Sequence, residues 1–526
     1  MKTINRENIL FFSPYLYFLV VAILYLFLSY YYTLNYPINA DDVQLCLRAF
    51  NRYLSDQQIG LLDFLLTKKK IYPNIFTKAF TAISYYSIGT VNFAVVNFFG
   101  NIGVVLFGFF CFKYSQSNFI RILIPTFLFV PAAASFVWVS ASTIYVYTLI
   151  MCFVCLFLTR NHGWYTYLIF PIAFFVALYT QSNGFLIGVP LIMFSLYQSL
   201  FQKKYNLKVS VFHTLIVVVF SYIYLNNLNF RSVSDPSGLS FGEKLLSEPF
   251  KYLIFSFKFN GMTAQNINFE IKDILALILG LFVFIHSSFL VLKNTYDEKL
   301  VHFYLIIIFL LGSAVLAGIG RSSPFAPRYE IISLCYSACY LVIVSKYDSR
   351  IFISVLAVII ILFSVIRLNL NLKELERYKY IFSKKMSTYL CTGNYVGKQR
   401  RSKHKGTMET VINEARSLNI YKPKFPLIKL KKANKKLRRI DKIQITENYI
   451  CENNQHYFAG NIFKKDIKKS IALKFGDNEF IYYDLYYDKR HLEMPDIDPI
   501  PFFCHNEIPK ILRKNKIETI TSFYSN

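Results

Sequence analysis

Long apolar runs alternate with short polar connections over the first 370 residues of the chain. A helix needs about 20 apolar residues to cross a bilayer, and a helix satisfies its own backbone hydrogen bonds in lipid. Runs of that length predict eleven membrane spans. They lie near residues 9–31, 91–112, 119–137, 141–159, 164–180, 184–201, 209–226, 272–292, 301–319, 329–345 and 351–369.

Two of these runs need comment. The run at 9–31 is too long for the apolar core of a signal peptide and lacks a small-residue cleavage site after it, so we interpret it as a retained span. The run at 119–137 contains Pro125 and Pro131, which predicts a broken or shallow helix.

Lys and Arg residues set the expected orientation, because short cytoplasmic loops retain them. With the N-terminus inside, the basic clusters near residues 113–121, 160, 203–208, 293–299 and 346–350 also fall inside. The exported side then receives the loops 32–90 and 227–271, the turns near 138, 182 and 320–328, and the tail.

The tail divides the chain into a transmembrane domain, residues 1–370, and a soluble domain, residues 371–526. A polar helical stretch, Leu372 to Ser387, precedes a basic region from Lys429 to Arg439, and alternation from Phe480 to Tyr487 indicates a strand. A Pro-rich connector follows at Pro495 to Pro501. The predicted fold class is an all-α polytopic membrane protein with a small C-terminal α+β domain.

Composition supports this assignment and narrows the partners. Hydrophobic residues make up 54% of the chain, charged residues 17%, and the mean hydropathy is +0.37, so water is not the main solvent. The net charge is +27, and the Lys and Arg residues that give rise to it lie at span ends and in the tail. There, anionic membrane lipids are nearer partners than nucleic acid. The Cys and His residues show no metal-type spacing, so no metal ligands are assigned among them.

An acidic pair, Asp41 and Asp42, follows the first span and opens an amphipathic segment. On capping preference alone, such a pair is more often the N-cap of an interfacial helix. The functional alternative is a general base or a ligand of a divalent cation at the exported surface.

A second group lies in the exported turn between the ninth and tenth spans. Arg321, Arg328 and Tyr329 stand there among Gly and Pro residues. Snorkelling and aromatic anchoring at the interface would account for each residue singly. Two guanidinium groups on a rigid turn also suit bidentate binding of a phosphate.

Polar breaks at two further exported turns supply candidate sugar contacts. Gln181 and Asn183 have amides that can bind hydroxyl groups, and Trp138 can stack on a sugar face. An Asn-Gly turn and an interfacial Trp are the plainer interpretations.

The acidic pair after the first span, the amphipathic first loop, the span number and the exported tail together resemble membrane glycosyltransferases of the GT-C superfamily. In size and tail the chain looks like the phage-type serotype-converting glucosyltransferases that decorate bacterial O-antigen. The aromatic-Gly-Arg signature of some relatives is missing after Asp42, and Lys68 to Pro73 occupies that region.

The resemblance implies a multi-pass protein of the bacterial inner membrane with a periplasmic C-terminal domain. It implies inverting transfer of a sugar, glucose for this subfamily, from undecaprenyl phosphate to lipopolysaccharide O-antigen or another lipid-linked glycan. Asp41 or Asp42 would act as base, and Arg321 and Arg328 would stabilise the departing phosphate.

Two alternatives come from other classes. An O-antigen polymerase or ligase usually has one very large exported loop between late spans, whereas here the bulk lies at the C-terminus. A flippase or transporter should carry ionisable residues inside its spans and broken helices in matched halves. The spans appear nearly free of acids and bases, which favours the transferase.

Overall fold

The computed structural model of the protein describes most of the transmembrane domain and part of the tail. The residues described are 6–33, 35, 37, 40–56, 58–66, 74–132, 136–160, 164–181, 183–198, 207–226, 241–262, 272–293, 297–319, 327–346, 350–392, 405–423, 438–440, 443–450, 455–462, 470–475, 479–484, 500–507 and 523–525. The contacts divide the chain into two compact units. The first comprises Met1–Glu376 and Glu414–Lys422, and the second comprises Arg377–Asn413 and Pro423–Asn526.

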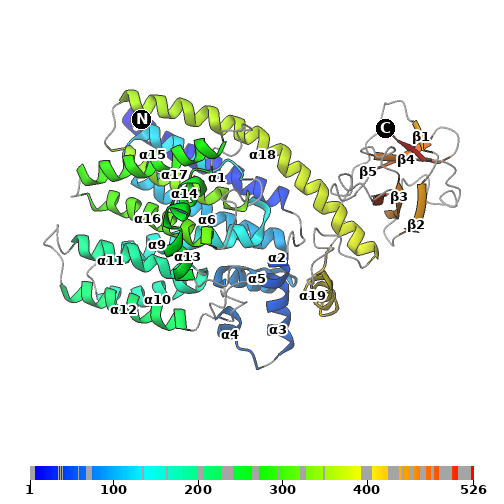
Figure 1. Ribbon diagram of the computed structural model, residues 1–526, viewed down its shortest axis with the longest axis horizontal. Coiled ribbons are helices and arrows are strands. Elements are labelled where there is room, and N and C mark those ends of the chain that lie inside the picture. Colours follow the sequence, from blue (N-terminus) through cyan, green and yellow to red (C-terminus); the bar gives the residue numbers. More distant parts are fainter. Residues whose placement is uncertain are drawn as a thin grey trace, which may run out of the picture. The chain divides into compact units, whose positions relative to one another are not determined.

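The first unit is a helical bundle (Figure 1). Its long helices are α1 (Arg6–Tyr32), α6 (Phe93–Tyr114), α9 (Val139–Arg160), α10 (Trp164–Thr180), α12 (Leu207–Asn226), α15 (Lys272–Lys293), α16 (Glu298–Ile319) and α18 (Arg350–Thr392). Shorter helices complete it: α7 (Asn118–Leu128), the 3-10 turn η2 (Gly184–Ile187) with α11 (Gly188–Tyr197), α13 (Phe241–Ser247), α14 (Pro249–Asn260), the 3-10 turn η5 (Pro327–Tyr329) and α17 (Glu330–Val344).

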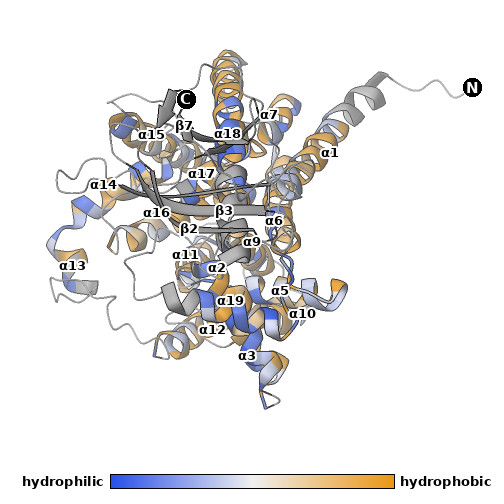
Figure 2. Ribbon diagram, turned by 90° about the vertical axis from the view of Figure 1, so that its right-hand side faces the viewer, coloured by the Kyte–Doolittle hydropathy of each residue, from blue (hydrophilic) through white to orange (hydrophobic). Residues whose placement is uncertain are grey.

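A helix stands at every one of the eleven predicted spans. Within the described residues, seven helices are long and apolar enough to cross a membrane, and four more are apolar but shorter. The protein is therefore a multi-pass membrane protein, and the predicted fold class is confirmed. The outward surfaces of α1, α15 and α18 are predominantly hydrophobic, as expected for helices that face lipid (Figure 2).

Two spans, α7 and α18, differ from their predicted extents. Helix α7 covers only Asn118–Leu128 and contains Pro125, in agreement with the predicted broken helix. Helix α11 runs to Tyr197, and the end predicted at 201 lies outside the described residues. Helix α18 does not end at 369 but continues without a break to Thr392, because residues 372–392 keep helical propensity after the apolar run ends.

Helix α14 lies within residues 227–271, which the sequence predicted as an exported loop, and is a packed member of the bundle. Glycines permit its close approach to α15. A Cβ atom at Gly280 would lie 2.1 Å from the carbonyl oxygen of Phe257, and one at Gly261 would lie 1.8 Å from that of Ala276. Small residues at such crossings are the usual means of tight helix packing in membranes.

The first loop forms a group of short helices at one end of the bundle (Figure 1). They are α2 (Ala40–Asp42), the π-helical turn η1 (Val43–Arg48), α3 (Ala49–Ser55), α4 (Leu61–Leu66) and α5 (Ile75–Ile88). The side chains of Val43, Cys46, Leu47 and Phe50 are fully buried, so this group packs as part of the first unit. The amphipathic first loop predicted from sequence is confirmed.

The second unit contains the predicted strands. A four-stranded sheet has the order β1-β7-β4-β5, and a three-stranded sheet has the order β2-β3-β6, with antiparallel pairing in both. The strands are β1 (Arg438–Ile440), β2 (Ile443–Ile450), β3 (Gln455–Ile462), β4 (Ser470–Phe475), β5 (Glu479–Asp484), β6 (Ile500–Glu507) and β7 (Phe523–Ser525), and helix α19 (Lys405–Ser417) precedes them.

Two predictions for the tail need revision. The strand predicted at 480–487 is present as β5, which ends at Asp484. The connector predicted at 495–501 overlaps strand β6, where Pro501 pairs with Asn461. Most of the basic region, from Lys429 to residue 437, lies outside the described residues.

Candidate functional site

Asp41 and Asp42 occupy the short helix α2 and differ sharply in exposure. Asp41 is exposed, whereas Asp42 is 1% exposed. Both lie in the first helical turn, where a carboxylate is favoured by the helix dipole. Asp42 has helical backbone angles and its side chain makes no capping hydrogen bond to η1, so the N-cap interpretation is wrong for Asp42.

The π-helical turn η1 begins directly after Asp42. Such turns are rare and occur often at functional sites, because the wider turn changes the direction of the side chains that follow. Here the turn buries Leu45, Cys46 and Leu47 and thereby fixes α2 against the bundle. Helix α2 also contacts α9.

Helix α5 contributes a buried lysine that the sequence analysis missed. Lys78 is 1% exposed, and its ammonium group donates hydrogen bonds to the carbonyl oxygens of Phe64, at 2.9 Å, and Leu65, at 3.4 Å. These are carbonyls at the end of α4, where a cation complements the helix dipole. Burial lowers the pKa of Lys78 from 10.5 to about 8.

Asn74 precedes α5 in the left-handed backbone conformation, at φ 52°. Its side chain is 1% exposed, and neither its amide nitrogen nor its amide oxygen has a hydrogen-bond partner among the described residues. A buried amide of this kind is costly unless a ligand or water satisfies it. No sequence signal distinguished Asn74 from other loop asparagines.

The first turns of α9 are where the predicted groups meet. Thr143 bonds Thr77 of α5, with 2.6 Å between the hydroxyl oxygens. The ring of Tyr145 packs edge-on against Tyr329 of the η5 turn, at 5.1 Å between centroids. Thr148 donates a 3.4 Å hydrogen bond to Gln181.

These contacts bring together elements from three of the predicted groups. Residues 143 to 148 span about 8 Å of helix axis, at 1.5 Å per residue. The first loop, the η5 turn and the break at residue 181 therefore surround one short stretch of α9. We call this stretch, with α2, α5, η5 and residues 181–184, the α9 site.

The η5 turn holds its residues in different ways. Arg328 is half-buried, its guanidinium lies 5.1 Å from the ring of Tyr329, and its Nε atom has no hydrogen-bond partner among the described residues. Tyr329 is 3% exposed and packs between Tyr145 and Phe259. Arg321 lies outside the described residues, so its predicted pairing with Arg328 stays a prediction.

The predicted sugar-binding residues lie around the same end of α9. The carbonyl oxygen of Trp138 accepts hydrogen bonds from the backbone N–H groups of Ala141 and Ser142 and so begins the helix. The buried indole nitrogen of Trp138 and the buried amide oxygen of Asn183 have no hydrogen-bond partners within the described part of the chain. Both atoms are available to a polar ligand.

A buried polar network fixes the start of α9 to α1 and α6. Asn97 donates to the hydroxyl of Thr33 at 2.6 Å and accepts from the hydroxyl of Ser142 at 2.6 Å. Tyr25 donates to the amide oxygen of Asn101 at 2.8 Å. A satisfied network of this kind specifies one arrangement of the three helices.

Arg367 corrects the expectation that the spans are nearly free of charge. It belongs to the apolar part of α18, is fully buried, and its Nη2 atom lies 2.6 Å from a carboxylate oxygen of Glu330. Glu330 follows Tyr329 directly, so this ion pair ties α18 to the η5 turn. A buried charge inside a membrane span is costly and is usually functional.

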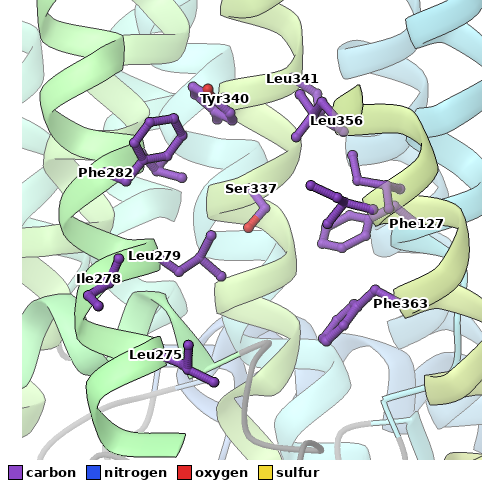
Figure 3. A pocket seen from close by; sticks show the side chains of 13 residues that line it. Phe127, Leu275, Ile278, Leu279, Phe282, Ser337, Tyr340, Leu341, Leu356 and Phe363 are labelled. Atoms are coloured by element: carbon purple, nitrogen blue, oxygen red, sulfur yellow. The ribbon is translucent and has the colours of Figure 1, made fainter. Parts of the chain in front are cut away.

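An apolar cavity of about 390 Å³ is lined in part by Phe363 of α18, one helical turn before Arg367 (Figure 3). Side chains of α7, α15, α17 and α18 line it, and Ser337 and Tyr340 are its polar members. Phe363 forms part of the wall, and its ring centroid lies 5.8 Å from the guanidinium of Arg367. The cavity is thus an apolar space.

The described residues contain no group of three or more His, Cys, Asp or Glu side chains that could hold a metal ion. The divalent cation considered for Asp41 and Asp42 therefore has no further carboxylate or imidazole ligand in that part of the chain.

Comparison with solved structures gives a distant similarity of fold. No family model and no curated protein matches the chain. The fold is similar to that of ArnT from Cupriavidus metallidurans, solved with undecaprenyl phosphate bound, with a TM-score of 0.42 and 10% sequence identity over 76% of this chain and 87% of that one. A similarity this weak carries no functional argument, so the proposals below rest on the residues of this chain.

Proposed function

We propose that the protein is a GT-C-type membrane glycosyltransferase that transfers a sugar from a polyprenyl phosphate to a glycan acceptor. The observation that carries the proposal is the convergence on α9 of the carboxylate-bearing α2 and the arginine-bearing η5 turn. A transfer of this kind needs a base for the acceptor and cations for the leaving phosphate, and these two elements supply both.

In the proposed reaction, a carboxylate removes the proton of an acceptor hydroxyl as that oxygen attacks the anomeric carbon. The bond from the anomeric carbon to the phosphate oxygen breaks, and its electron pair remains on the polyprenyl phosphate. Attack from the opposite face inverts the anomeric centre. Arg328, with Arg321, would stabilise the charge that develops on the phosphate.

Asp41 and Asp42 have different roles in this proposal. Asp41 is exposed and can reach an acceptor, so we assign it the role of base. Asp42 is buried and would hold α2 in place. The sugar would lie against Trp138, at the start of α9, and against Gln181 and Asn183, of which Gln181 contacts Thr148 of α9.

The apolar cavity supports a lipid-linked donor. Its apolar wall suits part of a prenyl chain. Glucose as the sugar, lipopolysaccharide O-antigen as the acceptor, and the periplasmic face of the inner membrane as the place of reaction complete the proposal.

The test compares Asp41→Asn and Asp42→Asn in the purified full-length protein with undecaprenyl-phosphate glucose and membrane glycans. We expect Asp41→Asn to lower kcat by about 100-fold or more, as for loss of a general base, with unchanged thermal stability. Asp42→Asn should lower both activity and the unfolding temperature. Full activity in both variants would overturn the mechanism.

The buried ion pair of Arg367 and Glu330 favours a second candidate, a lipid-glycan transporter, because transport proteins place charges inside spans. The two functions differ in their products. A transporter moves the intact lipid-linked sugar across a vesicle membrane, whereas the transferase releases polyprenyl phosphate. Measuring both in proteoliposomes decides between them.

A further inference from the structure

Part of the C-terminal tail belongs to the first unit. Residues Glu414–Lys422, which we call the strap, group with the membrane body, although the chain on both sides of them belongs to the second unit. The strap contains the last turn of α19. It continues through Asn419, in the left-handed conformation at φ 58°, into Ile420 and Tyr421.

The local sequence explains why the helix ends there. Asn is among the few residues that adopt the left-handed conformation at modest cost, and it commonly follows a helix C-terminus. The backbone N–H groups of Ile420 and Tyr421 then both donate to the carbonyl oxygen of Ala415, at 2.9 and 3.0 Å. This turn directs Ile420 and Tyr421 onto the first loop.

Four contacts attach the strap to the first unit. The carbonyl oxygen of Ile420 accepts a 2.7 Å hydrogen bond from the N–H of Val91. The Tyr421 hydroxyl donates to the carbonyl oxygen of Asn35 at 2.7 Å, and the Tyr421 ring packs edge-on against Phe93 at 5.5 Å. A carboxylate oxygen of Glu414 accepts from the Asn51 amide at 3.2 Å.

These contacts are well buried for a tail segment. Ala415 is fully buried, and Ile420 and Tyr421 are each 1% exposed. A buried tyrosine whose hydroxyl has a partner contributes both apolar contact and orientation. The contacts also place the strap and the first loop on the same side of the membrane, as the predicted topology requires.

The partners of the strap stand on either side of the acidic pair. Asn35 precedes Asp41, and Asn51 follows Asp42, in the same loop. The amide oxygen of Asn35 also accepts from the backbone N–H of Phe93, at 2.9 Å, so the strap, the loop and the start of α6 form one connected group.

Helix α2 is the first turn of a longer helical stretch. It continues without a break through η1 and α3, so residues 40–55 form one segment whose placement is set by the contacts along it. The direction of the Asp41 carboxylate therefore depends on those contacts. The strap contacts Asn35, before this segment, and Asn51, within it.

We propose that the strap is a positioning element that holds the acidic pair in its reactive orientation, so that the tail of the chain completes the α9 site. This inference rests on the proposed function for its catalytic part. Its structural part does not, because the strap would order residues 37–50 whatever the reaction is.

The first experiment is hydrogen exchange by mass spectrometry on the full-length protein in nanodiscs. We expect Tyr421→Ala to lose amide protection in peptides that cover residues 37–50, while peptides from α15 and α16 keep theirs. Leu418→Ala is the matched control, because Leu418 is 42% exposed in the same segment. Unchanged protection in Tyr421→Ala would overturn the inference.

The second experiment separates positioning from general stability. Tyr421→Phe keeps the ring and removes one hydrogen bond, so we expect kcat to fall about two- to tenfold with little change in donor KM. Asn51→Ala and Glu414→Ala should each lower kcat, and the double variant should fall no further than the worse single variant. Unchanged kcat in Tyr421→Ala would overturn the positioning role.

The two proposals fail in different ways. If the wild-type protein consumed no polyprenyl-phosphate sugar, the proposed function would fail and hydrogen exchange would still decide the structural role of the strap. If the wild type were active and the strap variants matched it in kcat and protection, the strap inference alone would fail.

Discussion

At the scale of single residues, the stability of the first loop depends on pH through a buried lysine. Burial lowers the pKa of Lys78 from 10.5 to about 8. Between these values the unfolded chain holds a proton that the folded chain has lost, so stability rises with pH across this window. Below about pH 8 both states are protonated and the cost of burying the charge is constant.

We therefore expect the unfolding temperature of the wild-type protein to rise between about pH 8 and 10.5 relative to that of Lys78→Met. Differential scanning fluorimetry in one detergent, with both proteins at each pH, measures the difference. The variant lacks the titrating group and serves as the reference for all other groups. A difference that stays flat or falls over the window would show that Lys78 is not held in a desolvated site.

Residue-level chemistry was only partly predictable from the sequence. The pair Asp41 and Asp42 stood out by its place after the first span, but its division into one exposed and one buried carboxylate depends on how α2 packs. Lys78 and Asn74 gave no signal at all. Their burial arises from contacts of α5 with α4 and α9, which a local pattern does not contain.

At the scale of elements, the packing of α14 against α15 depends on the absence of side chains at the crossing. A Cβ atom at Gly280 would lie 2.1 Å from the carbonyl oxygen of Phe257, which is backbone and cannot turn aside. The carbonyl oxygen of Gly280 also accepts a 2.9 Å hydrogen bond from the hydroxyl of Tyr336. The crossing therefore joins three helices.

Gly280→Ala should destabilise the protein by about 1–3 kcal/mol, which is the usual cost of overpacking. We expect to measure this as a lower unfolding temperature. Gly312→Ala is the control in a neighbouring helix, because a Cβ atom there meets its nearest neighbour at an ordinary 3.7 Å. Equal stability of the two variants would mean that α14 does not approach α15 so closely. Both substitutions replace Gly by Ala inside a helix and raise helix propensity by the same amount. The difference in stability between the two variants therefore reports packing alone.

The elements themselves were largely predictable. Runs of apolar residues located a helix at each of the eleven predicted spans, and in the described residues seven of these helices are long and apolar enough to cross a membrane. The role of α14 was not predictable, since twelve residues with two lysines do not meet that length. The polar helical stretch predicted at Leu372 to Ser387 is present, but as the continuation of α18, because helical propensity continues where hydropathy stops.

At the scale of the whole molecule, the sequence indicated the composition of the α9 site but not how its parts meet. Asp41, Arg328, Tyr329 and Gln181 lie in loops that are far apart along the chain. The topology placed them on one side of the membrane, and tertiary packing then brought their elements to α9. Arg367 escaped notice because one charge within a long apolar run barely changes its mean hydropathy.

The apolar cavity gives the last prediction. A lipid chain in the bilayer is already in an apolar environment, so entering the cavity gains shape-dependent contacts and no transfer free energy. Binding of polyprenyl phosphate should then depend on the fit of the chain to the wall.

Ser337 points into the cavity, so Ser337→Trp should fill it and weaken binding of undecaprenyl phosphate about tenfold, measured by native mass spectrometry (Figure 3). A phosphate with a short prenyl chain should bind equally to wild type and Ser337→Trp, because it does not need the cavity. Phe289→Trp, on the outward face of α15 where Phe289 is 60% exposed, is the control. If Ser337→Trp bound both lipids as the wild type does, the cavity would have no part in donor binding, and the chain would lie along the outer surface of the bundle.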